Sequence, residues 1–231
     1  MQIILSLNGP NNILPADTDL RDYLLSSKDS SIFEKILAPL ISTFGDKTQL
    51  RIIMGEKDWG YRDWILRKAK DVFEDTDLFY AKNCDTQNQS IQAYVNNSNL
   101  DDYKSCIVIP KDTIIGIDFF KKIVANDKLM EVGLGTFRSN NPKYGYILQE
   151  KDRNIFSTDR VISDLAFSGV YFFKTVSLLK EIVSNDAQDR LLFDIFARIT
   201  EKVQTTLIEA PSHAVTTLDD LTEYVAQLNG I

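Results

Sequence analysis

Residues 136–173 read TFRSNNPKYGYILQEKDRNIFSTDRVISDLAFSGVYFF, and this stretch decides the fold that the sequence predicts. Tyr146-Ile147-Leu148 and Gly169–Phe173 contain the β-branched and aromatic residues that are typical of strands. Gln149–Asn154 has the polarity of a hairpin turn, and an irregular segment follows before the last strand. The stretch therefore predicts a small β-hairpin that leads into a strongly apolar strand.

The rest of the chain alternates between short apolar runs and amphipathic segments. Strands are expected at Ile3–Leu7, Leu50–Met54, Phe79–Tyr80, Cys106–Ile109 and Thr205–Glu209. Helices are expected from Ile32, which Ser31 can cap, and over Asp63–Phe73, Ser90–Val95, Asp118–Val124, Thr175–Val183, Arg190–Lys202 and Leu218–Leu228. This alternation predicts a Rossmann-like α/β fold, with a mostly parallel sheet flanked by helices on both faces.

The composition bounds the class of protein. With 231 residues, 44% of them hydrophobic, the chain can bury one sizeable core, so we expect a single domain over residues 1–231. A net charge of −7 argues against a nucleic-acid partner, because phosphate binding depends on clustered Lys and Arg. No apolar run approaches the ~20 residues of a membrane helix, and the opening residues MQIILSL lack the basic front of a signal peptide. We therefore expect a cytoplasmic protein without a membrane partner.

The cysteines and the single histidine exclude further kinds of chemistry. Cys84 and Cys106 show no metal-ligand spacing and suit a reduced protein better than a disulfide scaffold. One histidine, His213, leaves little room for histidine-based zinc chemistry or for a Ser-His-Asp triad.

The decisive stretch resembles the acceptor-binding half of the sugar-phosphate nucleotidyltransferases. In that family a YG strand is followed by a turn, an acidic-basic pair and an A-x-x-G-(I/V)-Y-x-F strand. Here YGY at 144–146 and AFSGVYFF at 166–173 take these places, and SHAVTTLDDLTEYVAQL at 212–228 resembles the closing motif of the family. The resemblance implies the nucleotide-diphospho-sugar transferase (GT-A-like) fold, with the hairpin as the acceptor region.

The resemblance implies a nucleotide site at the segment IILSLNGPNNILP, residues 3–15, which takes the place of the Gly-rich phosphate loop of the family. Leu7, Asn8 and Gly9 would contact the nucleotide there, although no Arg or Lys precedes Arg21. Arg21 falls nearest to the phosphate-binding lysine of the family, and Lys28 follows in the next turn, so both are catalytic candidates.

Asp112, in SCIVIPKDTIIG, matches the aspartate that binds Mg²⁺ in the family. A carboxylate at the carboxyl end of a parallel strand suits a hard cation at the ligand edge of an α/β sheet. The other interpretation is an aspartate that begins a turn after Pro110-Lys111.

The same comparison implies two further sets of contacts. Gln87 and Asn88 lie where the family contacts the base. Gly145 matches the glycine whose backbone contacts the sugar, and the acceptor would also meet Asp159, Arg160 and Ser163. Each set has an ordinary alternative as polar loop or solvated surface.

Three functions follow as hypotheses. The first is a divergent Mg²⁺-dependent nucleotidyltransferase that joins an NTP to a phosphorylated sugar or related small acceptor for surface-polysaccharide precursors. The second is a catalytically inactive relative that acts as a binding protein or as a regulatory partner of another enzyme, with Tyr23 or Asn12 filling the pocket. In either case the partners considered include a second copy of the chain, as a homo-oligomer, or a partner enzyme. The third is a glycosyltransferase, against which the single aspartate of PKDTI counts.

Overall fold

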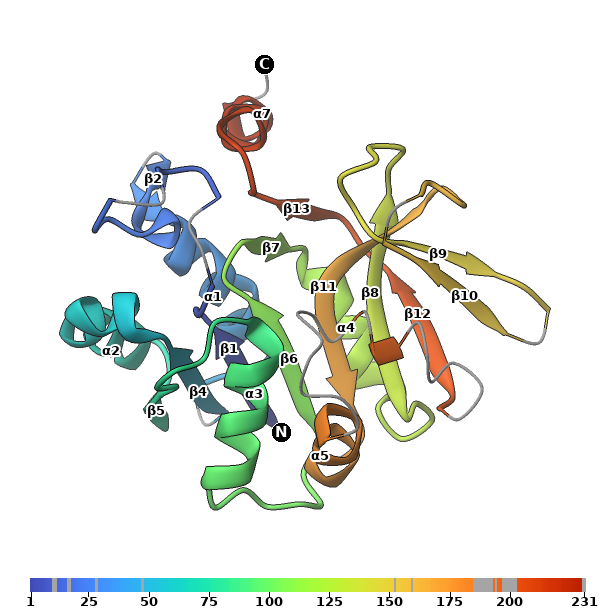
Figure 1. Ribbon diagram of the computed structural model, residues 1–231, viewed down its shortest axis with the longest axis horizontal. Coiled ribbons are helices and arrows are strands. Elements are labelled where there is room, and N and C mark those ends of the chain that lie inside the picture. Colours follow the sequence, from blue (N-terminus) through green and yellow to red (C-terminus); the bar gives the residue numbers. More distant parts are fainter. Residues whose placement is uncertain are drawn as a thin grey trace.

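The computed structural model describes residues 1–9, 12–15, 18–27, 29–46, 48–151, 153–158, 160–184, 193, 195–196 and 203–229 (Figure 1). Its strands are β1 (Gln2–Ser6), β2 (Ser26–Ser27), β3 (Ser30–Ser31), β4 (Gln49–Met54), β5 (Thr76–Tyr80), β6 (Cys106–Pro110), β7 (Thr113–Ile115), β8 (Val132–Arg138), β9 (Tyr146–Gln149), β10 (Asn154–Ser157), β11 (Leu165–Phe173), β12 (Thr205–Glu209) and β13 (Ser212–Ala214). Its α-helices are α1 (Ile32–Phe44), α2 (Arg62–Lys70), α3 (Gln87–Asn97), α4 (Ile117–Asn126), α5 (Val176–Ser184) and α7 (Leu218–Asn229), and two 3₁₀ turns cover Asp22–Leu24 and Glu56–Tyr61.

One nine-stranded sheet organises the chain. Its order is β10-β9-β11-β6-β1-β4-β5, with β8 beside β11 and β12 beside β8. Strands β6, β1, β4 and β5 are parallel neighbours, and β12 runs parallel to β8. The α/β fold with a sheet flanked by helices is confirmed, and β11 adds an antiparallel part by pairing with β6, β8 and β9.

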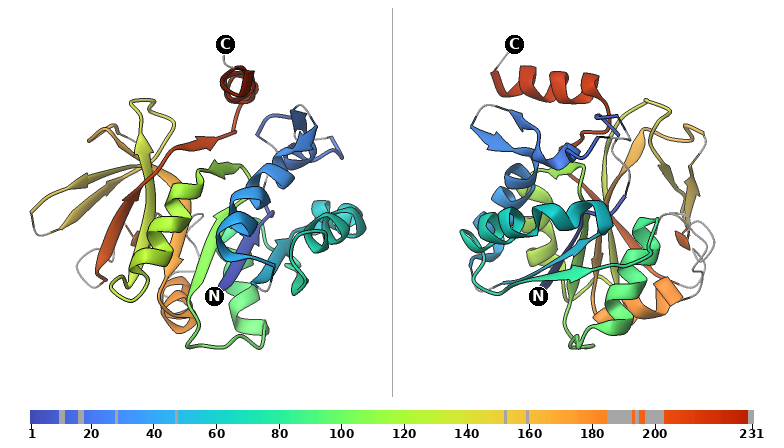
Figure 2. Two further views of the ribbon diagram at one scale, coloured as in Figure 1. Left: turned by 180° about the vertical axis from the view of Figure 1, so that it is seen from behind. Right: turned by 60° about the vertical axis from the view of Figure 1, so that its left-hand side comes forward.

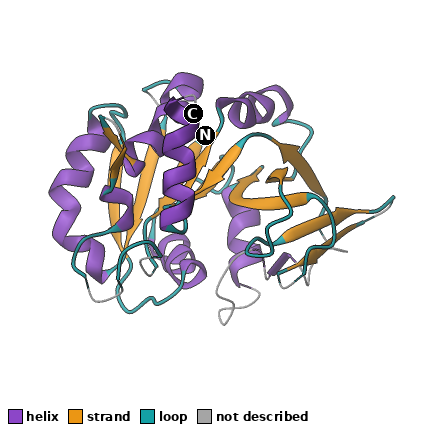
Figure 3. Cartoon of the chain, turned by 90° about the horizontal axis from the view of Figure 1, so that it is seen from above, coloured by secondary structure: helices purple, strands orange, loops and turns teal. Residues whose placement is uncertain are grey.

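Ile3–Leu5 of β1 and Cys106–Ile109 of β6 are continuous apolar runs because helices cover both faces of the sheet (Figure 3). In β1, Ile3 and Leu5 pack into the cluster that contains α1, α2 and α4. Ile4, which points the other way, packs into the cluster that contains α3 and α5. Alternate residues of one strand therefore enter two separate cores, and all of β1 is buried.

An irregularity in β11 shapes the edge of the sheet at which β6 ends. The register of β11 with β8 shifts between Phe167 and Tyr171, and Gly169 lies within this shift at a φ of +84°. A Cβ atom on Gly169 would lie 2.9 Å from the Pro110 side chain, so this position requires glycine for space as well as for conformation. Ser168 and Gly169 are thereby held against the end of β6.

Most of the predicted elements are confirmed, and β8 is the main one whose start the sequence pattern misplaced. The stretch that the sequence pattern singled out begins at Thr136, whereas β8 begins at Val132. Gly133 and Gly135 hide the strand pattern, since glycine is usually depleted in strands. A Cβ atom on Gly133 would lie 2.7 Å from the Ile208 side chain, and one on Gly135 would lie 2.3 Å from the Ser168 side chain. Neither position therefore has room for a side chain.

The chain closes with β13 and α7, which lie at the end of the molecule opposite the N-terminus (Figures 1 and 2). β13 pairs with β7, the short strand that follows β6, so the closing segment returns to the carboxyl end of β6. Most of the predicted helix Arg190–Lys202 lies outside the described residues. Among the described helices, none has both the length and the apolar character needed to cross a lipid bilayer.

Candidate functional site

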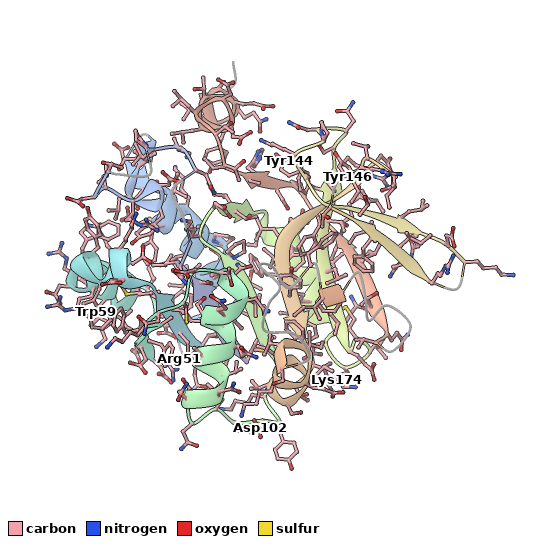
Figure 4. All side chains as sticks on the ribbon, in the orientation of Figure 1. Arg51, Trp59, Asp102, Tyr144, Tyr146 and Lys174 are labelled. Carbon is pink, nitrogen blue, oxygen red and sulfur yellow. The ribbon has the colours of Figure 1, made fainter. Side chains whose placement is uncertain are left out.

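A cleft of about 700 Å³ lies at the carboxyl ends of β1 and β6, which is where open α/β sheets bind ligands. Five of the predicted site residues line it, although they come from segments far apart in the chain: Asn8, Gly9, Gln87, Asp112 and Gly145. The described residues that line it are Ser6, Asn8, Gly9, Asn12, Asp85, Thr86, Gln87, Pro110, Lys111, Asp112, Thr113, Lys143, Tyr144, Gly145, Thr158, Phe167, Ser168, Gly169, Tyr171 and Phe193. In Figure 4, Tyr144 marks the same end of the molecule as β13, whereas Asp102 and Lys174 mark the opposite end.

The loop after β1 turns at Gly9, whose φ of +132° favours glycine. Its carbonyl oxygen accepts two cationic donors, Arg21 Nη2 at 2.6 Å and Lys111 Nζ at 3.0 Å. The Asn8 side-chain amide donates to the Cys84 carbonyl at 2.9 Å, which ties this loop to the segment that precedes α3. The positions of Asn8 and Gly9 in the cleft agree with the predicted nucleotide loop, but their contact with a nucleotide stays a prediction.

Asp112 lies two residues after the end of β6 and is a half-buried lining residue of the cleft. Burial raises the pKa of its carboxyl, the ammonium of Lys111 opposes this, and the negative charge of Asp22 adds to the rise. The Asn12 amide donates to Asp112 Oδ2 at 3.4 Å, a long hydrogen bond that leaves most of the carboxylate available. When ionisation of a carboxyl group is unfavourable, a bound cation stabilises its charged form.

Lys111 is 5% exposed, although it is a lysine. Burial lowers the pKa of its ammonium to about 8, and the neighbouring positive charge of Arg21 acts in the same direction. The carboxylates of Asp112, Asp58 and Asp22 oppose this shift. At pH 7 the group is therefore mostly charged, and it sits at the strand end beside the carboxylate of Asp112.

Arg21 lies beneath the loop rather than in the cleft. It is 2% exposed, and its Nε donates to Asp58 Oδ1 at 2.7 Å. Tyr23 donates its hydroxyl to the same carboxylate oxygen at 3.0 Å, so Tyr23 belongs to the core and does not fill the pocket. This geometry gives Arg21 the role of holding the Gly9 carbonyl, and little of its surface is left for a triphosphate.

The predicted base-binding end of the cleft is formed by the start of α3. Thr86 caps the helix by accepting from the Gln89 backbone amide at 3.2 Å, and Gln87 follows at the cleft wall. Asn88 is fully buried and is not one of the lining residues. Leu7 is also fully buried, and its side chain packs in the core, so only its backbone is close to the loop.

The predicted acceptor end is more aromatic than the sequence suggested. Gly145 lines the cleft, but a Cβ atom there would lie 2.8 Å from the Phe193 ring, which covers this glycine. Phe193 in turn stacks on Phe167, with the ring centroids 4.8 Å apart. Thr158, Ser168 and Tyr144 are the lining residues near this end whose hydroxyls could bind an acceptor.

The remaining predicted acceptor residues do not line the cleft. Ser163 is used structurally: its hydroxyl donates to the Ile147 carbonyl at 2.7 Å and accepts from the Leu165 amide at 3.1 Å. Arg160 is exposed and is not one of the lining residues. Lys28 and Asp159 lie outside the described residues.

The metal-binding capacity of the cleft rests on Asp112. Within the described ranges, no three His, Cys, Asp or Glu side chains gather as they would in a preformed metal site. Mg²⁺ is often held by one or two carboxylates together with the phosphates of a substrate. The residues present fit a Mg²⁺ ion that arrives with a triphosphate, and they do not form a cage that would hold the ion alone.

Sequence reasoning missed Lys111 and the aromatic wall, whereas for Lys143 it left open a contact with an anionic acceptor or a solvated surface charge. Lys143 lies in the connection between β8 and β9, forms an ion pair with Asp220 at the start of α7, and lies 4.9 Å from the Tyr144 ring centroid. Lys111 could have been found from its place immediately before Asp112. The position of Phe193 depends on a segment distant in sequence, and no local pattern reveals it.

Comparison with known proteins supports the interpretation of the fold. No protein-family model matches the sequence, and no curated protein matches it. Solved structures do match over almost the full chain. A nucleoside-diphosphate-sugar pyrophosphorylase from Vibrio cholerae has a TM-score of 0.73 at 16% identity, covering 98% of this chain and 100% of its own. The chain has the fold of the sugar nucleotidyltransferases.

Two further nucleotidyltransferase-fold structures contain ligands. A UDP-glucose pyrophosphorylase complexed with UDP-glucose has a TM-score of 0.76 at 13% identity, covering 100% of this chain and 99% of its own. A UTP-bound UGPase from Acinetobacter baumannii has a TM-score of 0.74 at 10% identity, covering 98% and 92%. At these identities the likeness establishes the fold alone.

Proposed function

We propose that this chain binds a nucleoside triphosphate in the cleft and transfers its nucleotidyl group to a phosphorylated small molecule. The observation that carries the proposal is the pair Lys111 and Asp112, a cation and a carboxylate at the carboxyl end of β6 and within one cleft. Nucleotidyl transfer depends on positioning and on neutralising a triphosphate, which are the tasks of such a pair.

The reaction needs few groups from the protein. A phosphate oxygen of the acceptor forms a bond to the α-phosphorus of the NTP, and pyrophosphate leaves with the electron pair of the broken P–O bond. Asp112 would hold Mg²⁺, and the ion would neutralise charge on the phosphate oxygens. Asn8 and Gln87 would face the nucleotide, and Gly145 would face the acceptor from the opposite wall.

Structural neighbours support the substrate class. One is described as bound to UTP and another as complexed with UDP-glucose. For this chain we propose that the substrates are an NTP and a phosphorylated sugar or related small acceptor. The product would supply surface-polysaccharide precursors. The chain would act in the cytoplasm, either alone, as a homo-oligomer or beside a partner enzyme.

A binding experiment tests this function first. Calorimetric titration with ATP, CTP, GTP, UTP and dTTP, each with and without Mg²⁺, should give micromolar binding of one nucleotide that depends on Mg²⁺. Asp112→Asn should remove the Mg²⁺ dependence and lower a demonstrated turnover by about a hundredfold or more. Asp102→Asn, at the opposite end of the molecule, is the matched control and should bind as the parent does. Unchanged Mg²⁺-dependent binding in Asp112→Asn would refute the role of Asp112.

A second candidate function is nucleotide binding without transfer. Two observations favour it: Arg21 is committed to Asp58, and the Phe193 ring covers Gly145. A protein of this kind would bind an NTP and Mg²⁺ but release no pyrophosphate with any phosphorylated acceptor. Pyrophosphate release by the purified protein alone would exclude it.

A further inference from the structure

Two cations from distant parts of the chain converge on the carbonyl oxygen of Gly9. Arg21 Nη2 lies 2.6 Å from this oxygen and Lys111 Nζ lies 3.0 Å from it. The two cations differ in their other contacts. Arg21 makes an ion pair with Asp58 beneath the loop, whereas Lys111 is one of the residues that line the cleft.

We propose, on the basis of the proposed function, that Lys111 binds the phosphate groups of the nucleotide. It would thereby replace the cation that the loop after β1 lacks. No Arg or Lys occurs between Met1 and Leu20, so the loop itself carries no positive charge. A lysine side chain has a flexible four-carbon stem and three donors, so it can turn from a neutral carbonyl to a phosphate by a small movement. Arg21 holds the Gly9 carbonyl in either arrangement.

The charges around Lys111 are compatible with this exchange. Arg21, Asp112, Asp58 and Asp22 are the charged groups that act on it. Asp58 is occupied by Arg21 and Tyr23, and Asp22 accepts from the backbone amides of residues 12–14. Asp112 therefore remains as the carboxylate facing the phosphates, and Mg²⁺ on it would turn its repulsion of them into attraction.

An arginine at this position keeps the positive charge of Lys111. Lys111→Arg should therefore retain most of the affinity for phosphate that Lys111→Met loses.

The test uses the full chain and two probes, the NTP that binds best and inorganic tripolyphosphate, each with Mg²⁺. We expect Lys111→Met to weaken both by about ten- to a hundredfold, since it removes charge-assisted hydrogen bonds. Binding of the nucleoside without phosphates should stay unchanged. Lys121→Met, on the exposed surface of α4, is the matched control. Lys111→Arg keeps the charge, so its affinity for tripolyphosphate relative to the parent is the readout if Lys111→Met does not fold.

The outcomes separate this inference from the proposed function. If the parent binds an NTP, and Lys111→Met binds it equally well, the phosphate role is overturned while nucleotide binding stands. If the parent binds tripolyphosphate but no nucleotide, and Lys111→Met loses that binding, the phosphate role stands and the nucleotide function fails. If Lys111→Met weakens the nucleoside as much as the NTP, the lysine is structural. Absence of binding to every probe overturns both.

Discussion

The guanidinium of Arg21 is enclosed by the protein, with Asp58 at 2.7 Å and the Gly9 carbonyl at 2.6 Å. Burial also raises the pKa of Tyr23, so its hydroxyl stays a donor to Asp58. An ion pair of this kind contributes little net stability as a pair, but removing one member leaves a buried charge without compensation.

Arg21→Met should therefore lower the free energy of unfolding by about 3–5 kcal/mol at pH 7, measured by urea denaturation. Arg67→Met, an exposed arginine of α2, is the control and should change the same quantity by less than about 0.5 kcal/mol. If Arg21→Met were as stable as the parent and bound NTP more weakly, Arg21 would be the phosphate ligand that the sequence predicted.

At the residue scale, the resemblance to the sugar-phosphate nucleotidyltransferases singled out Asp112, and its place after a continuous apolar strand agrees with the carboxyl edge of a parallel sheet. The position of Lys111 was not accessible in the same way. Its conformation depends on the direction of the Gly9 carbonyl, which is set by a positive φ and by Arg21. Neither of these can be read from residue spacing.

The start of α1 shows how one element is fixed by its own sequence and by a neighbouring helix. Ser31 accepts from the Glu34 amide at 3.2 Å, and Glu34 accepts from the Ser31 amide at 2.9 Å, which completes a capping box. Lys68 of α2 donates to the second carboxylate oxygen of Glu34 at 2.7 Å. These contacts lower the pKa of Glu34 to about 2, with the Lys68 hydrogen bond as the main cause.

Glu34→Gln should lower the free energy of unfolding by about 1 kcal/mol at pH 7. The folded pKa is below the unfolded value of 4.5, so the stabilisation is complete above that value and is lost as the pH falls toward 2. Urea unfolding at pH 7 and at pH 3 should show the difference between variant and parent shrinking. Glu74→Gln, an exposed position, controls for a general charge effect. A difference that grows on acidification would contradict this account.

At the element scale, the sequence predicted most helices and central strands because their apolar patterns and caps are local. The strands it missed depend on distant partners. β7 and β13 are three residues each and exist only through their pairing with one another. β8 carries two glycines that are required by Ile208 and Ser168 across the sheet, so its own composition gives a weak strand pattern.

The whole molecule joins a parallel half, β6-β1-β4-β5, to a half built around β8, β9, β11 and β12. The cleft lies where the two halves meet, and its walls come from the loop after β1, the start of α3, the end of β6 and the bulge of β11. Alternation of strands and helices predicted the first half. The order of strands in the second half required β11 to insert between β6 and β8, which no local pattern specifies.

This insertion has a consequence for the order in which the chain can fold during its synthesis. β6 ends at residue 110, yet its sheet neighbour β11 begins only at residue 165. While the intervening residues are being made, the backbone of β6 presents an open and apolar edge, which is a template for pairing with another chain.

A chain that stops at residue 164 should therefore aggregate, whereas the full chain stays monodisperse; light scattering of the two, refolded side by side, measures the difference. A chain that stops at residue 217, before α7, is the control and should behave as the full chain does. If both truncated chains aggregated equally, exposure of β6 would not be the cause. From the synthesis of residue 110 until that of residue 165, the growing polypeptide therefore exposes an unpaired apolar strand edge. A chaperone would protect the chain during that interval.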